Sequence, residues 1–121
     1  MTITQETAAP FLAEWFDAWN RHDVEAITSH YAPDVEYYSP FVADLTGGTG
    51  RLQGIEAVTN YFRAALERFP DLRFDPPLHI AVGAGSVAFV YRSVNNLLAV
   101  ETLVFDETGR VTRAHCHYGP S

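Results

Sequence analysis

The sequence of 121 residues has little cysteine, few basic residues and no long apolar run. Cys116 is the single cysteine, which excludes an intrachain disulfide. No apolar run approaches the roughly 20 residues that a helix needs to cross a bilayer. Residues 1–10 lack the basic and apolar regions of a secretory signal peptide. We therefore expect a cytoplasmic protein without disulfides or membrane spans.

Positive charge is also scarce. The chain has 8 basic and 15 acidic residues, a formal net charge of −7, and its basic residues are scattered. Nucleic acids and anionic membranes bind to clustered positive charge, so neither is an expected partner. The stretch GGTG at 47–50 lacks the Lys and the Ser or Thr of a phosphate-binding loop. We interpret it as a flexible turn.

The composition is otherwise that of a globular protein, with 47% hydrophobic residues. A chain of this length is expected to form one domain, 1–121, with a sizeable core. Apolar residues at helical spacing predict a helix over 11–19, with Pro10 in its first turn. The same spacing predicts a second helix over 55–69 that ends before Pro70.

A short helix and several strands complete the predicted elements. Asp23 can cap a helix that ends at Ser29 or His30. Residues 32–41 become extended after a Pro-Asp turn, and residues 43–54 are interpreted as a glycine-rich loop. Alternating patterns predict strands over 72–82, 86–94, 97–105 and 110–118. Three helices and an antiparallel meander predict an α+β fold, with the helices packed on one face of a curved sheet.

The asparagines at 95–96 suggest a two-residue hairpin turn. This turn would pair Val90 with Glu101, and it would make Arg92 a diagonal neighbour of Glu101 on one face of the sheet. Leu103 shares that face by alternation. Both faces of the hairpin are apolar, so both should be covered. We expect the helices to cover one face and a second copy of the chain to cover the other, as a homodimer.

The last predicted strand, with the sequence AHCHYG near its end, has two histidines around the cysteine. A three-residue and a four-residue loop in the preceding DETG turn differ by one residue in register, and that slip exchanges the two faces of the strand. Alternation alone therefore leaves open which residues share a face with Glu101. The alternatives are His115 with His117, or Cys116 with Tyr118.

Three stretches of the chain resemble a known family. FLAEWFDAWNRHDVEAITSHYAPDVEYYSP (11–40) resembles the opening of the nuclear transport factor 2-like superfamily, and within it the SnoaL-like group. RLQGIEAVTNYFRAALERFPDLRF (51–74) resembles the family's G-x-x-A-I-x-x-F helix, and FDETGRVTRAHCHYG (105–119) its final hairpin. The resemblance implies a cone-shaped α+β barrel, in which a curved sheet surrounds a deep apolar pocket. It says little about the reaction, because this fold carries enzymes, binding domains and structural subunits.

Relatives in this superfamily include polyketide cyclases, ketosteroid isomerases and limonene epoxide hydrolases. By resemblance, Trp15 falls where ketosteroid isomerases have the tyrosine of their oxyanion hole. Ser39 falls at their aspartate base, and Glu101 at their protonated aspartic acid. Glu101 also falls at an acid of the epoxide hydrolases, whose second acid falls at Cys116. These matches imply that Cys116 and Tyr118 face the pocket together with Glu101.

Neither relative's complete catalytic set is present, and the residues of the last strand allow other chemistry as well as purely structural roles. His115 and His117 share a face and could be two ligands of a metal, but no third ligand is evident, and we interpret them as outer-face residues. Cys116 as a nucleophile would need a base on its own face, whereas its neighbouring histidines face the other way. We interpret it as a small buried hydrophobic residue.

Glu101 is the strongest catalytic candidate. Desolvation raises the pKa of a carboxyl in an apolar pocket, which suits general acid or base catalysis. Arg92 as its partner would oppose that shift, and the alternative is a structural ion pair between the two. Aromatic walls with a few polar groups are typical of small-molecule pockets. The predicted substrate-binding residues are Trp15, Trp19, Tyr37, Ser39, Phe62, Val90, Leu103, Cys116 and Tyr118.

Together these features predict a small SnoaL-like enzyme that uses no cofactor and no metal. Its substrate would be an apolar, carbonyl-bearing small molecule, and its reaction a proton transfer in an isomerisation, cyclisation, hydration or dehydration. Glu101 would carry the proton and Arg92 would tune it, while Tyr37 or Tyr118 would polarise the oxygen. The alternative is a non-catalytic protein of the same fold that binds a hydrophobic ligand or serves as a dimeric interaction module.

Overall fold

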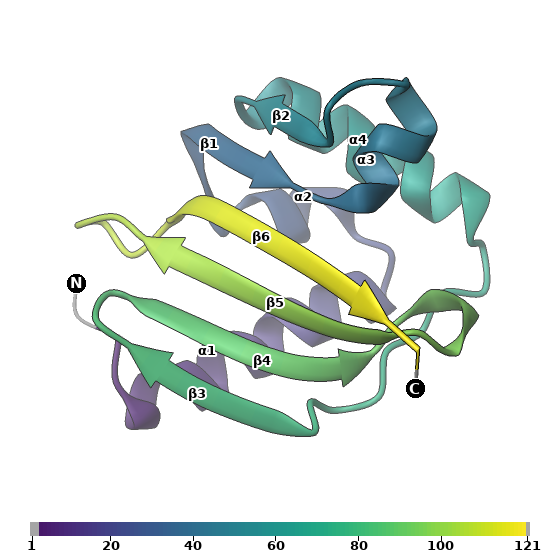
Figure 1. Cartoon of the computed structure of the whole chain (residues 1–121). Helices are drawn as coiled ribbons and strands as arrows, with labels where there is room; N and C mark the ends of the chain where they lie inside the picture. Colours follow the sequence, from purple (N-terminus) through teal and green to yellow (C-terminus); the bar gives the residue numbers. More distant parts are fainter. Residues whose placement is uncertain (1–2, 121) are drawn as a thin grey trace.

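The computed structural model describes residues 3–120 of the chain. These residues form four α-helices, one 3₁₀ turn and a single six-stranded sheet (Figure 1). In chain order they are α1 (Gln5–Asn20), α2 (Val24–Thr28), β1 (Tyr31–Tyr38), α3 (Pro40–Thr46), β2 (Arg51–Gln53), α4 (Ile55–Arg68), β3 (His79–Gly83), β4 (Ser86–Arg92), η1 (Val94–Asn96), β5 (Leu98–Phe105) and β6 (Val111–Gly119). The predicted α+β class is confirmed. Among the described residues, no helix is long and apolar enough to cross a membrane.

The strands follow the order β2-β1-β6-β5-β4-β3, so β2 and β3 are edges and the sheet is curved but not closed (Figure 1). The meander β3-β4-β5-β6 is antiparallel, as predicted. The expectation of an entirely antiparallel sheet is wrong, because β1 pairs with β6 in parallel. Parallel neighbours need a long crossover, and most of the chain lies between these two strands.

Helix α1 begins earlier than the sequence pattern predicts. The Thr4 side chain accepts from the backbone of Thr7, and the Thr7 side chain accepts from the backbone of Thr4. This capping box starts the helix at Gln5, so Pro10 lies inside the helix instead of in its first turn. The apolar stripe behaves as predicted, because its members are buried against the inner face of the sheet: Leu12, Trp15, Phe16 and Trp19.

Helix α3 was not predicted, although local signals for it are present. Ser39 is its N-cap, and the Ser39 hydroxyl accepts from the backbone N–H of Phe41 at 3.2 Å. Pro40 occupies the first turn, and Gly47 ends the helix with φ +71°, a conformation that favours glycine. The short strand β2 also lies in the stretch interpreted as a loop. Helix α3 forms one side of the cavity described below.

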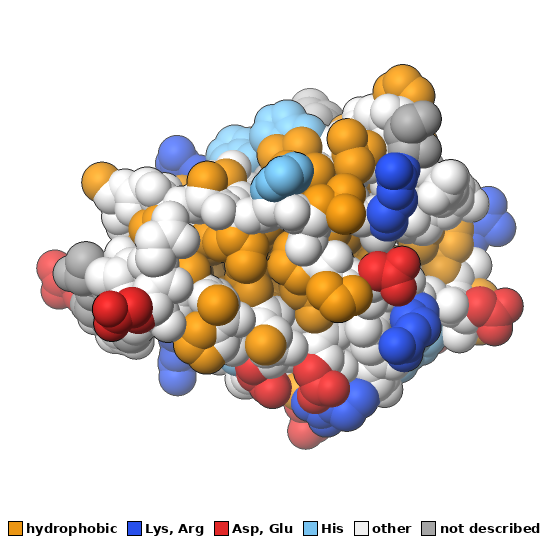
Figure 2. Space-filling model, turned by 90° about the horizontal axis from the view of Figure 1, so that it is seen from below, with side chains coloured by type: hydrophobic (Ala, Val, Ile, Leu, Met, Phe, Trp, Pro, Cys, Tyr) orange, Lys and Arg blue, Asp and Glu red, His pale blue; other side chains and the backbone are white. Residues whose placement is uncertain are grey.

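The segment before β3 is less regular than predicted, because only residues 79–82 of the expected strand 72–82 belong to a strand, which is β3. The Asn20 side chain donates to the Phe74 carbonyl at 2.9 Å and accepts from its N–H at 2.7 Å. This pair of hydrogen bonds ties the segment to the end of α1 and buries Phe74. Figure 2 shows hydrophobic side chains across the middle of the face that carries the β3 edge. Leu78, which directly precedes β3 in the chain, is 52% exposed.

The predicted register of the β4–β5 hairpin is wrong by one residue. Glu101 pairs with Phe89, not with Val90. The connection is not a two-residue turn: Asn95 and Asn96 both adopt φ +57°, and the Ser93 N–H donates to the Leu97 carbonyl at 2.8 Å. Three residues thus lie between the closing pair, and the odd number shifts every pair in the hairpin by one.

This shift exchanges the faces of β4. Phe89 and Tyr91 lie on the inner face with Glu101. Val90 and Arg92 lie on the outer face, so they are not the inward-facing site residues that the sequence predicts. The predicted diagonal contact of Arg92 with Glu101 is therefore wrong, and a tyrosine stands on that face in place of the arginine.

The β5–β6 register is the one implied by the family resemblance. Glu101 pairs with Cys116, and His117 pairs with Val100 on the outer face. The DETG turn has three residues between Asp106 and Arg110, closed by a backbone hydrogen bond of 2.8 Å. That turn alone would place Glu101 opposite His115. An irregularity of β6 next to the turn adds one residue and restores the pairing with Cys116.

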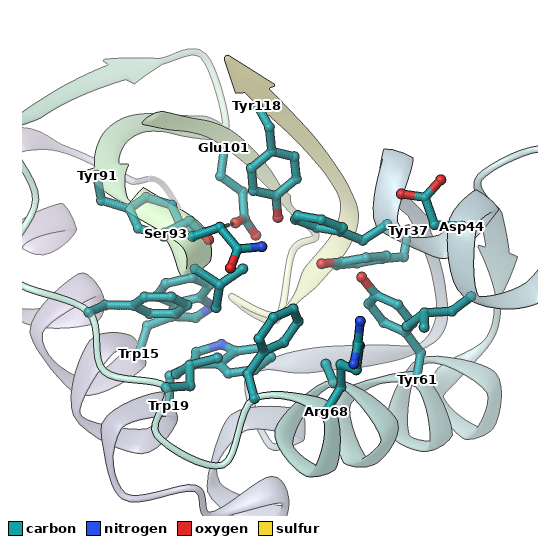
Figure 3. A pocket seen from close by; sticks show the side chains of 18 residues that line it. Trp15, Trp19, Tyr37, Asp44, Tyr61, Arg68, Tyr91, Ser93, Glu101 and Tyr118 are labelled. Carbon is teal, nitrogen blue, oxygen red and sulfur yellow. Dashed lines mark hydrogen bonds between the residues drawn. The ribbon is translucent and has the colours of Figure 1, made fainter. Parts of the chain in front are cut away.

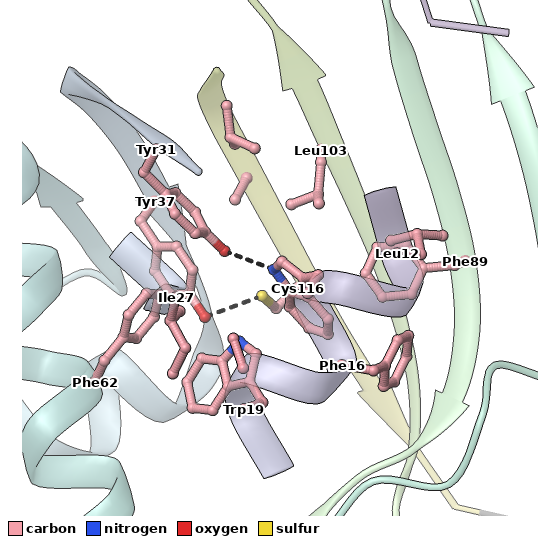
Figure 4. Close-up of a cluster of buried hydrophobic side chains, with 14 of the residues drawn as sticks. Leu12, Phe16, Trp19, Ile27, Tyr31, Tyr37, Phe62, Phe89, Leu103 and Cys116 are labelled. Atoms are coloured by element: carbon pink, nitrogen blue, oxygen red, sulfur yellow. Dashed lines mark hydrogen bonds between the residues drawn. The ribbon is translucent and has the colours of Figure 1, made fainter. Parts of the chain in front are cut away.

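The core lies between α1, α4 and the inner face of the sheet (Figure 4). Aromatic rings fill much of it, with Trp15 and Phe89 in an edge-to-face contact at 5.1 Å and Trp19 and Phe62 in another at 4.8 Å. Leu103 is fully buried among them. The core is hollow toward the β4–β5 loop, where Ser93, Val94 and Asn95 are among the residues that line a cavity.

Candidate functional site

A cavity of about 300 Å³ lies between α1, α3, α4 and the inner face of the sheet (Figure 3). This volume is at the lower end of those of small-molecule sites. Five of the predicted site residues line it: Trp15, Trp19, Tyr37, Glu101 and Tyr118. Four others are buried in the surrounding core: Ser39, Phe62, Leu103 and Cys116. Other residues that line the cavity were not predicted from the sequence, among them Tyr61, Arg68, Phe74, Tyr91, Ser93 and Asn95.

Glu101 is the buried carboxyl of the cavity wall. It lies in the middle of β5, where alternation points it inward, and it is 2% exposed. The Tyr91 hydroxyl donates to its Oε1 at 2.9 Å. Burial raises the pKa of Glu101 to about 7, although hydrogen bonds from Tyr91 and Cys116 act in the opposite direction. The carboxyl therefore exchanges its proton close to neutral pH.

The partner of Glu101 is a neutral phenol. Burial raises the pKa of Tyr91 well above its usual value, so the hydroxyl keeps its proton and remains a donor. A cation in this place would have held the carboxyl ionised, but Arg92 lies on the other face of the sheet. Because the phenol carries no charge, desolvation determines the pKa of the carboxyl.

Cys116 lies beside Glu101 but has the properties of a protonated thiol. Its Sγ donates to the Tyr37 hydroxyl at 3.3 Å, and its pKa is raised well above the usual value by burial (Figure 4). A thiolate is the nucleophilic form of cysteine, so this environment does not activate it. The flanking histidines are on the outer face, where the ring of His115 stacks on Tyr38 at 4.4 Å.

Besides Glu101 and Tyr91, the cavity wall contains the hydroxyls of Tyr61 and Tyr118, which are hydrogen-bonded with the buried Ser39 behind them. Burial raises the pKa of both phenols, and hydrogen bonding with Ser39 partly offsets the rise. Ser39 holds the start of α3, as described above, so its hydroxyl has a structural role. The ring of Tyr118 packs against Phe41 at 4.5 Å and forms the edge of the cavity near α3.

The two tryptophans of α1 differ in their hydrogen bonding. The Trp15 indole N–H donates to the Tyr31 hydroxyl at 3.1 Å (Figure 4). The Trp19 indole N–H is buried and has no partner among the described residues. Both side chains line the cavity, so an unsatisfied donor belongs to its wall.

The mouth of the cavity is the part that the sequence analysis missed most completely. Asp44 and Arg68, from α3 and α4, are exposed there, and Asn95 comes from the β4–β5 loop. No local pattern marks these residues, because they meet only when the helices and the loop come together. Tyr91, in contrast, would have been found if the hairpin register had been known.

Within residues 3–120, no three His, Cys, Asp or Glu side chains are arranged to hold a metal ion. His115 and His117 share the outer face of β6, and the pKa of His115 is lowered, chiefly by burial.

The layered arrangement is the nuclear transport factor 2-like fold. Among solved structures, a nuclear transport factor 2-like protein of unknown function from Cytophaga hutchinsonii has a TM-score of 0.71 at 15% identity, covering 99% of this chain and 94% of that chain. A protein proposed to be a polyketide cyclase from Sinorhizobium meliloti has a TM-score of 0.73 at 16% identity, covering 95% and 100%. At these identities the likeness shows the fold alone.

A more specific match comes from the sequence. The SnoaL-like domain model matches residues 12–118, and the chain therefore belongs to the SnoaL-like family. A SnoaL-like protein of unknown function from Burkholderia thailandensis E264 is 44% identical, with a TM-score of 0.90 and coverage of 97% of this chain and 98% of that chain. No curated protein matches the sequence significantly.

Proposed function

We propose that this SnoaL-like protein is an enzyme that transfers a proton on an apolar, carbonyl-bearing small molecule bound in the cavity. The observation that carries the proposal is Glu101, a buried carboxyl with a pKa of about 7 on an aromatic cavity wall. A group with a pKa near the working pH can both accept and donate a proton efficiently. Isomerisation, cyclisation, hydration and dehydration all need such a group, and none of them requires a cofactor here.

In the proposed reaction, ionised Glu101 takes a proton from the carbon next to the carbonyl and becomes a neutral acid. The electron pair moves to the carbonyl oxygen, and the neutral acid then returns the proton to the same or another carbon. The hydrogen bond from Tyr91 to Oε1 orients the carboxyl for this transfer. A donor on the wall would stabilise the oxygen, and the raised pKa values of Tyr37 and Tyr118 keep both phenols protonated.

The role predicted for Arg92 is not retained in this proposal. Arg92 faces away from the cavity, and Tyr91 takes its place as the group that orients the carboxyl. An uncharged partner is more suitable for a shuttle, since it leaves both protonation states of Glu101 accessible near pH 7.

Proton transfer can be tested before the natural substrate is identified. 1-Tetralone and cyclohexanone, incubated with the protein in D₂O, should exchange the hydrogens next to the carbonyl for deuterium faster than in buffer, as followed by NMR. Glu101→Gln should reduce this exchange by about 10²–10⁴-fold. Glu36→Gln is the matched control, because Glu36 lies on the outer face of β1 in ion pairs with Arg51 and Arg113. Exchange by Glu101→Gln at the wild-type rate would exclude Glu101 as the base.

A non-catalytic ligand-binding protein is the second candidate. It is favoured by Ser39, which caps α3 where a relative has its base, and by Cys116, whose thiol stays protonated. Glu101 would then bind a polar group of the ligand without moving a proton. Binding of the same ketones by the wild-type protein without exchange would support this function over the first.

We also propose that the outer face of the sheet pairs two copies of the chain in a homodimer. The centre of this face is apolar, formed by Val90, Leu98, Val100 and Val104. Val100 is 37% exposed there, although it is a large hydrophobic residue. Arg92 lies on the same face with a buried Nη1 that has no partner among the described residues. A second copy would cover the valines and offer acceptors to this guanidinium.

A further inference from the structure

The wall of the cavity contains a buried hydrogen-bond donor that the described residues leave unsatisfied, the indole N–H of Trp19. Trp19 is 6% exposed. The great majority of buried polar groups in native proteins have a partner, so each exception asks for an explanation. Two other buried side-chain nitrogens, on His30 and Arg92, also lack a partner within the described part of the chain, but neither residue lines the cavity.

Trp15 provides an internal comparison. It lies one helical turn before Trp19, its ring centre is 6.0 Å from that of Trp19, and its N–H is paired with Tyr31. Of these two neighbouring indole N–H groups, one therefore has a hydrogen-bond partner and the other has none among the described residues. In Figure 3, Trp19 and Glu101 lie on opposite sides of the cavity, and the indole nitrogen is on the cavity side of its ring. The open donor and the carboxyl thus face a common space.

We infer that the Trp19 indole N–H binds the carbonyl oxygen of the ligand, and that the ligand is an uncharged ketone-like molecule spanning the cavity from Trp19 to Glu101. This inference rests on the proposed function and specifies its binding geometry. A ligand with its carbonyl at Trp19 directs the neighbouring carbon toward Glu101. The Tyr37 hydroxyl accepts from Cys116 and the Tyr118 hydroxyl is hydrogen-bonded with Ser39, so both phenols already have a hydrogen-bond partner in the protein. The Trp19 indole N–H is the one of these three groups that has no partner among the described residues.

The Trp19 N–H and the Glu101 carboxyl, at the two ends of the cavity, favour a ligand that is an uncharged hydrogen-bond acceptor. An indole N–H donates and cannot accept, so it offers nothing to an ammonium group. A carboxylate in this small cavity would be repelled by Glu101 in its ionised form and would lose its hydration among aromatic rings. A carbonyl oxygen accepts from the indole at a much smaller desolvation cost, and the aromatic walls cover the rest of the molecule.

The inference can be tested with pairs of probes that differ only at the acceptor: cyclohexanone with methylenecyclohexane, and 1-tetralone with 1-methylidenetetralin. Trp19→Phe keeps an aromatic ring and removes the N–H. We expect it to weaken ketone binding by about tenfold and to change alkene binding by about twofold at most. In the wild-type protein, the Trp19 indole N–H signal in ¹⁵N NMR should move on addition of a ketone and not of its alkene, and this measurement does not depend on how the variant folds.

Trp15→Phe is the matched control. It removes an N–H that is already paired with Tyr31, so it should lower thermal stability and leave the ketone-to-alkene affinity ratio unchanged. An equal ratio in the wild type and Trp19→Phe, together with an unmoved indole signal, would overturn the inference while deuterium exchange still supports Glu101 as the base. Tighter binding of cyclohexylammonium than of cyclohexanone would also overturn it. If none of the four probes binds and no exchange occurs, both proposals are wrong.

Discussion

The Tyr91 hydroxyl donates a hydrogen bond of 2.9 Å to Oε1 of Glu101, from the neighbouring strand. Both residues are 2% exposed. A buried carboxyl with a neutral partner has no cation to stabilise its charge, and its pKa rises to about 7. This pair therefore determines the acid–base chemistry of the cavity.

Tyr91→Phe should raise the pKa of Glu101 further above 7. The hydroxyl stabilises the ionised carboxylate, so its removal favours the protonated form. A ¹³C NMR titration of the glutamate carboxyl carbons measures the shift, and Glu101→Gln identifies the signal. Tyr61→Phe is the control, because Tyr61 lines the cavity and its hydroxyl contacts Ser39. A fall in the pKa of Glu101 in Tyr91→Phe would contradict the hydrogen bond described here.

The stability of the protein should depend on pH through Glu101. Its carboxyl has a pKa of about 7 in the folded state and about 4.5 in the unfolded state. Between these values only the folded state holds the proton, so stability relative to Glu101→Gln is highest below pH 4.5 and falls by roughly 3 kcal/mol as the pH rises through 7. Urea unfolding of both proteins from pH 4 to 8 measures the difference. A constant difference over this range would show that Glu101 is not desolvated.

Glu36→Gln should change the pH dependence of the free energy of unfolding in the opposite direction in the same experiment. Hydrogen bonds from Arg51 and Arg113 lower the pKa of this half-buried carboxyl. Its contribution is therefore present above its unfolded pKa and is lost as the pH falls through the folded value. The two glutamates should give pH profiles that run in opposite directions.

Cys116 should be unreactive in the folded protein. Its thiol is buried, and burial raises its pKa well above the usual value, so little thiolate exists at pH 8. The rate of reaction with a disulfide reagent such as DTNB, measured with and without guanidinium chloride, tests this. We expect slow labelling in buffer and rapid labelling of the unfolded chain. Native labelling at the rate of a free thiol would mean that Cys116 is accessible and ionised.

Val100→Asp should convert the proposed homodimer into monomers, because it places a charge at the apolar centre of the outer face. Light scattering coupled to size-exclusion chromatography measures the mass, and circular dichroism confirms that the fold is retained. Leu45→Asp is the control, since Leu45 is an exposed apolar residue on α3. A wild-type protein with the mass of one chain would end the dimer proposal.

Local sequence signals account for much of what was predicted correctly. The apolar stripes of 11–19 and 55–69 lie within single helices, where spacing alone defines the buried face. Pairing β6 through Cys116 needed more than alternation. This pairing depends on one added residue in β6 near the DETG turn, which the alternating pattern does not reveal. The family resemblance, not the pattern, predicted the correct register.

The candidate site was predicted in part for the same reason. Trp15, Trp19, Tyr37, Glu101 and Tyr118 were identified and line the cavity. Val90 and Arg92 were misplaced because the loop at 93–97 has a different length from the turn that the asparagines suggest. The exposed residues at the mouth, such as Asp44 and Arg68, come from separate elements and share no sequence pattern.

The sequence by itself determined the α+β class and the principal helices and strands, because helical and strand periodicity are local properties of the chain. Both faces of the hairpin are apolar, so the inward position of the acid on β5, Glu101, was implied by the family resemblance and not by periodicity. Tertiary structure decided that Tyr91 and not Arg92 meets that acid, and that the N–H of Trp19 is left open while that of Trp15 is paired. The first outcome depends on a shift of one residue in the pairing of β4 with β5. The second depends on which of two successive turns of α1 brings an indole N–H to Tyr31. Only the packing of the sheet against the helices decides between such alternatives.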